Sequence, residues 1–72
     1  MKSVEEFEKA WNVVQDKTKK IIAFNGTHFL ADEYRVTSFY GEDVVKHWVD
    51  FKNYSSPVFQ AGYYLSDIER IE

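Results

Sequence analysis

Two runs of β-branched and aromatic residues flank a single short turn in the middle of the chain, and this pattern limits the fold more than any other. Residues 34–40 and residues 44–51 each alternate along their length, and Gly41, Glu42 and Asp43 lie between them. Such alternation on both sides of a glycine-containing turn is typical of a β-hairpin. We therefore expect a hairpin over residues 34–51 at the centre of an antiparallel sheet.

The second arm of this hairpin has a competing interpretation. On a helical wheel its apolar residues gather on one arc, and Glu42 and Asp43 would stand at the helix start, where the helix dipole favours acids. Its three Val, one Trp and one Phe are instead typical of a strand. We favour a strand over residues 44–51 and keep a short second helix at residues 43–52 as the alternative.

The N-terminal segment carries a helix pattern. Ser3 and Glu6 are spaced as a capping box, in which each side chain accepts a hydrogen bond from the backbone of the other residue. An apolar stripe follows at helical spacing, formed by Val4, Phe7, Ala10, Trp11 and Val14. We expect a helix from this cap to about Lys17, with its stripe packed on the sheet.

Shorter strands are expected on both sides of the central hairpin. In chain order we expect a strand at residues 21–24, a turn at Asn25-Gly26, a returning strand at residues 27–31, a loop at residues 52–57 and a last strand at residues 58–65. Asp32-Glu33 marks either a turn or a bulge. After a short turn at Ser66-Asp67, Ile68 and Ile71 should dock on the sheet edge.

These elements predict an α+β fold that forms a single small domain over residues 1–72. It consists of an N-terminal helix packed on a bent antiparallel sheet of about five strands, either open or closed into a small SH3-like or OB-like barrel. A chain of 72 residues can build only a small core, so aromatic side chains must fill it densely. The expected core members among them are Phe7, Trp11, Phe24, Phe29 and Trp48.

Composition and motifs disfavour several classes of function. The formal net charge is −3, and residues 21–72 carry eight acidic against four basic side chains, which disfavours a nucleic-acid surface. The chain has no Cys, no apolar run long enough for a membrane span and no signal-peptide pattern, so we expect a cytoplasmic protein. His28 and His47 match no zinc spacing, and no phosphate-binding loop or nucleophile elbow occurs. We therefore expect no enzymatic activity, no cofactor and no metal.

Adjacent aromatic residues indicate where a binding surface lies. Neighbours on a strand face opposite ways, so the pairs Phe39-Tyr40 and Tyr63-Tyr64 each place one ring on the outer face of the sheet. Two acid pairs occupy predicted turns and would form one negative patch if both turns emerged at the same end of the sheet. The candidate partner-binding residues are therefore Asp32, Glu33, Tyr40, Glu42, Asp43, Tyr63 and Tyr64.

Exposed aromatic rings with charged neighbours fit protein interfaces, so we expect a non-catalytic protein-binding module, a small intracellular regulator or inhibitor of a larger protein. By association with small acidic Cys-free domains common on mobile genetic elements, we also expect that a phage or another mobile element encodes it. The alternative is a nucleic-acid-binding barrel that stacks bases on the same aromatics and binds phosphates through Lys17, Lys19, Lys20, Arg35 and Lys46. An exposed sheet edge is also a route to a homodimer.

Overall fold

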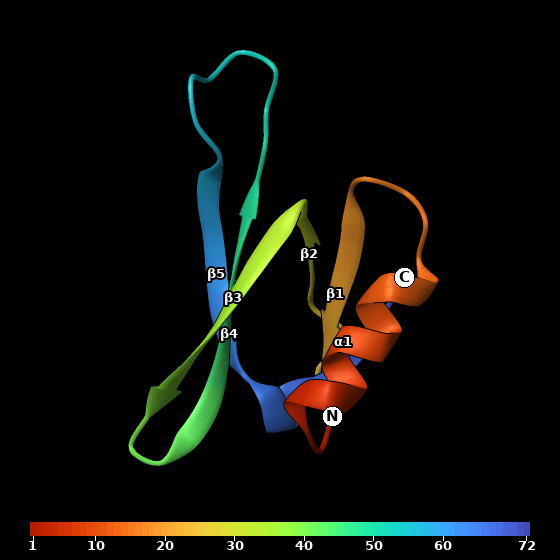
Figure 1. Ribbon diagram of the computed structural model, residues 1–72, viewed down its shortest axis with the longest axis vertical. Coiled ribbons are helices and arrows are strands. Elements are labelled where there is room, and N and C mark those ends of the chain that lie inside the picture. The colour runs from red at the N-terminus through yellow and green to blue at the C-terminus, as the bar shows by residue number, and fades with distance from the viewer.

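The computed structural model describes all residues, 1–72, as one helix and two three-stranded antiparallel sheets (Figure 1). The elements are α1 (Val4–Val13), β1 (Lys19–Ala23), β2 (His28–Ala31), β3 (Glu33–Phe39), β4 (Glu42–Val49), β5 (Val58–Tyr64), the one-turn 3-10 helix η1 (Leu65–Asp67) and β6 (Ile68–Ile71). The predicted α+β class with antiparallel sheets is confirmed. Six strands replace the expected five, in the orders β2-β1-β6 and β3-β4-β5, and the two sheets do not close into a barrel.

The central hairpin is present, and the alternative helix at residues 43–52 is wrong. β3 pairs with β4 over its whole length, from Glu33 opposite Trp48 to Phe39 opposite Glu42. The turn consists of Tyr40 and Gly41, whose φ angles of 51° and 78° are those of a type I′ hairpin turn. The turn therefore begins one residue earlier than expected, and Glu42 and Asp43 already belong to β4.

The second sheet contains the strand that the sequence did not reveal. β1 pairs with β2 on one side, as expected from the Asn25-Gly26 turn, and with β6 on the other. In this pairing Ile71 of β6 lies opposite Ile21 of β1, and Ile68 of β6 lies opposite Ala23 of β1. The four residues of β6 therefore join the sheet through their backbone, and Ile68 and Ile71 also pack their apolar side chains on the core.

Asp32 lies at a bend between β2 and β3, so the predicted interruption at Asp32-Glu33 is a bend that separates two strands of different sheets. The Asp32 backbone N–H donates to the Trp48 carbonyl over 2.8 Å, so pairing with β4 begins at the bend itself. Its carboxylate accepts from the Thr18 hydroxyl (2.5 Å) and from the Asp50 backbone N–H (2.6 Å). The bend carries the chain from one sheet into the other.

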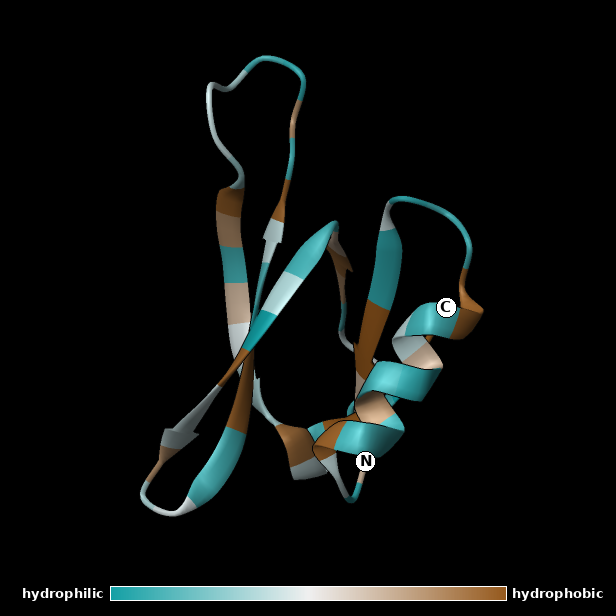
Figure 2. Ribbon diagram, in the orientation of Figure 1, coloured by the Kyte–Doolittle hydropathy of each residue, from teal (hydrophilic) through white to brown (hydrophobic).

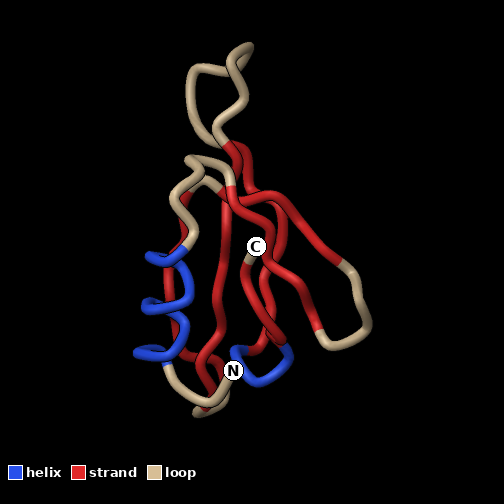
Figure 3. The backbone as a smooth tube through the Cα atoms, turned by 90° about the vertical axis from the view of Figure 1, so that its right-hand side faces the viewer, coloured by secondary structure: helices blue, strands red, loops and turns tan.

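The helix closes the core between the sheets. Ser3 caps it by accepting from the Glu6 backbone N–H (3.1 Å), as predicted. The helix ends at Val13, earlier than the expected Lys17, since the β-branched pair at Val13 and Val14 favours the extended conformation that Val14 adopts. Figure 3 shows α1 alongside the strands. Figure 1 shows it beside β1 on the right of the view, with β5 on the left.

The core is small, and its buried residues come from α1, η1 and four of the strands. These buried residues are Phe7, Ile21, Ala31, Val45, Leu65 and Ile68. In Figure 2 hydrophobic residues are prominent in β1, in β4 and at η1, which supply three of these side chains. On β3, Tyr34 faces this core and meets the rings of Phe7 and Trp11 at centroid distances of 4.7 and 4.8 Å. The opposite face of the β3-β4-β5 sheet is left free.

Candidate functional site

The strand register assembles a distinct outer face on the β3-β4-β5 sheet. Val45 and His47 of β4 are buried, so their neighbours Val44, Lys46 and Trp48 point to the other side. Three cross-strand rows result. They are Thr37-Val44-Tyr64, Arg35-Lys46-Gly62 and Glu33-Trp48-Phe59. With Phe39 at the end of β3, we call the side chains of Arg35, Phe39, Lys46, Trp48, Phe59 and Tyr64 the outer aromatic face.

Aromatic rings on this face are exposed to an unusual degree. Phe39 and Phe59 are 53% and 52% exposed, and Tyr40 at the turn is 91% exposed. Trp48 meets Phe59 edge to face at 5.5 Å between centroids, and Phe39 meets Tyr40 at 4.5 Å. Isolated exposed apolar residues are common on proteins, but a cluster on one sheet face marks an interaction site more often than chance.

Two cations lie side by side at the centre of the face. Arg35 and Lys46 are directly opposite each other in the β3-β4 register. The Arg35 guanidinium lies over the Trp48 ring, 5.7 Å from its centroid, and neither cation forms an ion pair. Like charges directly opposite on paired strands destabilise a sheet, so this arrangement costs stability in the free protein.

A groove crosses the face where Gly62 lacks a side chain. It has a volume of about 250 Å³ and is lined by Thr37, Ser38, Phe39, Val44, Lys46, Gly62 and Tyr64. A Cβ atom at Gly62 would stand 3.5 Å from Lys46 Cγ and 3.7 Å from Val44 Cγ1, which is ordinary contact. Glycine therefore leaves open a space that a larger residue would fill without strain.

The predicted aromatic residues divide between the two faces. Tyr64 lies on the outer aromatic face and Tyr40 stands exposed at the turn beside it. Tyr63 points the other way, where its ring stacks on His47 (6.2 Å, 6° between planes) and touches Phe29 at 5.9 Å. Of the adjacent pair, only Tyr64 is therefore available to a partner at this face.

The two acid pairs do not form one patch. Asp32 and Glu33 lie at the start of β3. Glu42 and Asp43 lie at the start of β4, just after the Tyr40-Gly41 turn and therefore at the other end of the hairpin. Asp32 is occupied by its hydrogen bonds to Thr18 and Asp50. Glu33 lies in the same row as Trp48, so one acid stands at each end of the outer aromatic face.

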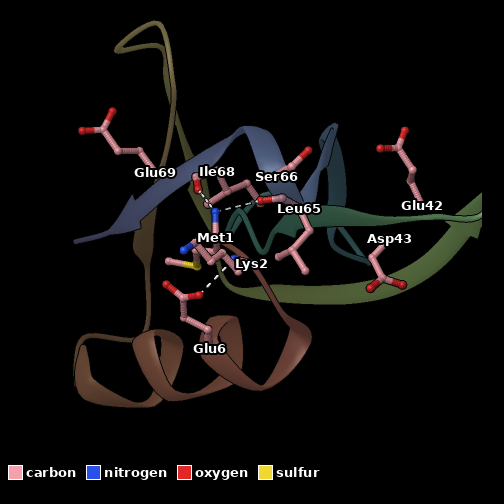
Figure 4. Close-up of a pocket in the computed structure, with 9 residues that line it drawn as sticks. All are labelled: Met1, Lys2, Glu6, Glu42, Asp43, Leu65, Ser66, Ile68 and Glu69. Carbon is pink, nitrogen blue, oxygen red and sulfur yellow. Dashed lines mark hydrogen bonds between the residues drawn. The ribbon is translucent and has the colours of Figure 1, made fainter.

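A second hollow lies beside the N-terminal residues, and Glu42 and Asp43 line it together with Glu6 and Glu69 (Figure 4). Its volume is about 610 Å³. The Met1 amino group donates to the carbonyls of Leu65 (3.1 Å) and Ile68, and Glu6 accepts from the Lys2 backbone N–H over 2.9 Å. No group of three or more His, Cys, Asp or Glu side chains in the structure is arranged to hold a metal ion.

His47 belongs to the interior. It is fully buried, and neither of its ring nitrogens has a hydrogen-bond partner of good geometry. Burial lowers the pKa of His47, an effect that a weak polar contact with the Leu30 backbone partly offsets. The side chain is therefore neutral near pH 7 and packs as an aromatic ring between Phe29 and Tyr63.

Trp48 and Phe59 are functional candidates that the sequence reasoning missed. Trp48 was expected in the core, as was Phe24, but Trp48 is only partly buried on the outer face and Phe24 is 70% exposed. The signal for Trp48 was the alternation of β4 itself, which places it with Lys46 and apart from Val45 and Val49.

No protein-family model, curated protein or solved structure matches this chain. The structure contains no helix that is both long enough and apolar enough to cross a membrane.

Proposed function

We propose that the protein is a non-catalytic protein-binding module, a small intracellular regulator or inhibitor of a larger protein, and that it binds through the outer aromatic face. The observation that carries this proposal is the gathering of partly exposed Phe39, Trp48, Phe59 and Tyr64 around Arg35 on one free sheet face. Trp, Tyr, Phe and Arg are the residues most enriched in protein interfaces and their hot spots. The groove at Gly62 offers a socket for one partner side chain.

The test uses random peptides displayed on phage, selected on the immobilised protein and then titrated by two-dimensional NMR. The face variant is Phe39→Ala with Phe59→Ala, since both rings are about half exposed and their truncation leaves the core intact. The matched control is Val13→Ala with Phe24→Ala, which removes exposed apolar side chains elsewhere (77% and 70% exposed).

Selected peptides should shift the amide signals of β3, β4 and β5. Their affinity should fall at least about tenfold in the face variant, because truncating a hot-spot side chain typically costs more than 1 kcal/mol. The control variant should bind as the wild type does. Equal losses in both variants, or shifts confined to other elements, would contradict the proposal.

Single-stranded nucleic acid is the second candidate, favoured by the Arg35 side chain stacked on Trp48. Among the other expected phosphate ligands, however, Lys17 pairs with Asp50 at 3.3 Å, and Lys19 is buried and donates to the Asp16 carbonyl over 2.7 Å. Titration of Trp fluorescence with single-stranded DNA and RNA at low salt tests this candidate, since electrostatic binding is strongest at low salt. If no binding is seen there, this candidate is eliminated.

A further inference from the structure

On the premise that the outer aromatic face binds protein, we infer that its partner is a peptide segment that presents a carboxylate between apolar side chains, with basic residues farther out. Three features of the face lead to this chemistry. They are the unpaired cations at its centre, the apolar rows on both sides of them, and the acids at its two ends.

The cations at the centre lack an anion. Side chains directly opposite on paired strands have Cβ atoms about 4.5–5.5 Å apart, so the charges of Arg35 and Lys46 lie within range of a single carboxylate. Glu33 and Glu42 project from the same face, one row or more away, yet neither pairs with a cation. A partner carboxylate placed between Arg35 and Lys46 removes their repulsion and gains two charge-assisted hydrogen bonds.

Apolar surface flanks the cations along the strand direction. The row on one side contains Trp48 and Phe59, and the row on the other contains Val44 and Tyr64. The Gly62 groove opens next to Lys46, between Val44 and Tyr64. Residues on either side of the partner's carboxylate therefore meet aromatic and aliphatic surface, where burial of apolar area favours binding.

The acids at the ends of the face select against a polyanion. Glu33 stands at the end of the row that contains Trp48 and Phe59, and Glu42 lies beyond the row that contains Val44 and Tyr64. A nucleic-acid strand carries a charge at every nucleotide and would bring phosphates to these carboxylates. Along the face the charges run from acidic to basic to acidic. A peptide with one central acid and basic residues farther out is complementary to this order, which favours a protein partner over nucleic acid.

The test compares two random nonapeptide libraries on phage, one with Asp fixed at the central position and one with Lys. The wild-type protein should retain the Asp library at least tenfold better. In the Lys46→Glu variant the preference should reverse or disappear, because one central charge changes sign on an exposed side chain. The Lys52→Glu variant changes the net charge equally from an exposed loop position and should keep the wild-type preference.

The outcomes separate this inference from the function on which it rests. If both libraries are retained equally and the Phe39→Ala, Phe59→Ala variant loses both, the face binds protein but the acidic preference is wrong. If neither library is retained, or if sedimentation shows a dimer that buries the face, the inference and the proposed module both fail. Tighter binding of single-stranded DNA or RNA at the same face would also overturn it.

Discussion

At the scale of single residues, two positions, Tyr40 and His47, lower the stability of the folded protein. Tyr40 is a non-glycine residue with a positive φ of 51°, a region that L side chains other than Asn and Asp seldom occupy. His47 is an imidazole buried without hydrogen bonds, where a hydrocarbon side chain would cost less. The backbone strain at Tyr40 holds an exposed ring next to the outer aromatic face.

Relief of the strain at Tyr40 should stabilise the hairpin. Tyr40→Ala and Tyr40→Asn both remove the ring, but Asn tolerates the left-handed conformation that a type I′ turn requires. We expect Tyr40→Asn to exceed Tyr40→Ala in free energy of unfolding by about 0.5–1 kcal/mol. Urea unfolding of both variants measures the difference. Equal stabilities would mean that the backbone at this turn is not strained.

His47 should make the protein less stable in mild acid. Well above pH 6.5, the ordinary pKa of a His side chain, the imidazole is neutral in both the folded and the unfolded chain and contributes no pH dependence. Because burial lowers the pKa of His47 in the folded state, the unfolded chain binds the proton first as the pH falls. The free energy of unfolding should then drop by up to about 1.4 kcal/mol per pH unit, until the folded state also protonates.

The measurement is denaturant unfolding at several pH values between 7 and 5. His47→Leu should flatten the slope in this range, whereas His28→Gln, a change at an exposed position, should keep it. A slope that survives in His47→Leu would assign the pH dependence to other groups.

At the scale of the elements, the sequence was most informative where a pattern ran for several residues. The β3-β4 hairpin and the start of α1 were predicted from alternation and from the Ser3 cap, and both are present. β6 was missed because four residues are too few for a period to show, and its strand character depends on pairing with β1.

Side-chain direction was predicted less well than strand position. Alternation groups the side chains of β4 and β5 into two faces, but it does not tell which of the two faces the rest of the fold covers. Trp48 was therefore assigned to the core, and Tyr63 was assigned to the binding surface together with Tyr64. The buried neighbours Val45 and His47 decide the matter only once the fold is known.

Gly62 allows a test of the groove in β5 that does not depend on truncating an aromatic ring. Gly62→Ala should raise the free energy of unfolding by about 0.5–1 kcal/mol, because glycine weakens a strand interior and the new methyl group meets only ordinary contacts. The same methyl group fills part of the groove, so selected peptides should bind at least threefold more weakly. Thermal unfolding and NMR titration check the two effects, and unchanged affinity would remove the groove from the binding site.

At the scale of the whole molecule, α1 holds two open sheets together. Phe7 is fully buried, stacks on Trp11 and meets Tyr34 edge to face, so it joins the helix to the inner face of β3. A domain of this length has a total stability of roughly 4–11 kcal/mol. Loss of one central contact is therefore a large fraction of what keeps the protein folded.

Phe7→Ala should lower the free energy of unfolding by about 3–5 kcal/mol. If the wild-type stability lies at the low end of the range above, the variant should be largely unfolded. Val13→Ala, at a position on the same helix that is 77% exposed, should change stability by less than about 0.5 kcal/mol. Circular dichroism melting curves compare the two. A small effect of Phe7→Ala would show that the sheets hold together without the helix.

The loop of residues 50–57 extends beyond the rest of the molecule at the end opposite the Tyr40-Gly41 turn (Figures 1 and 3). Exposed loop tips of this kind accept inserted sequence with little effect on the domain behind them. A fluorophore or a second domain can therefore be carried between Asn53 and Ser56 while the outer aromatic face stays free. With a fluorophore inserted in this loop, the protein could serve as a sensor in which the reporter and the binding surface lie at different places on the molecule.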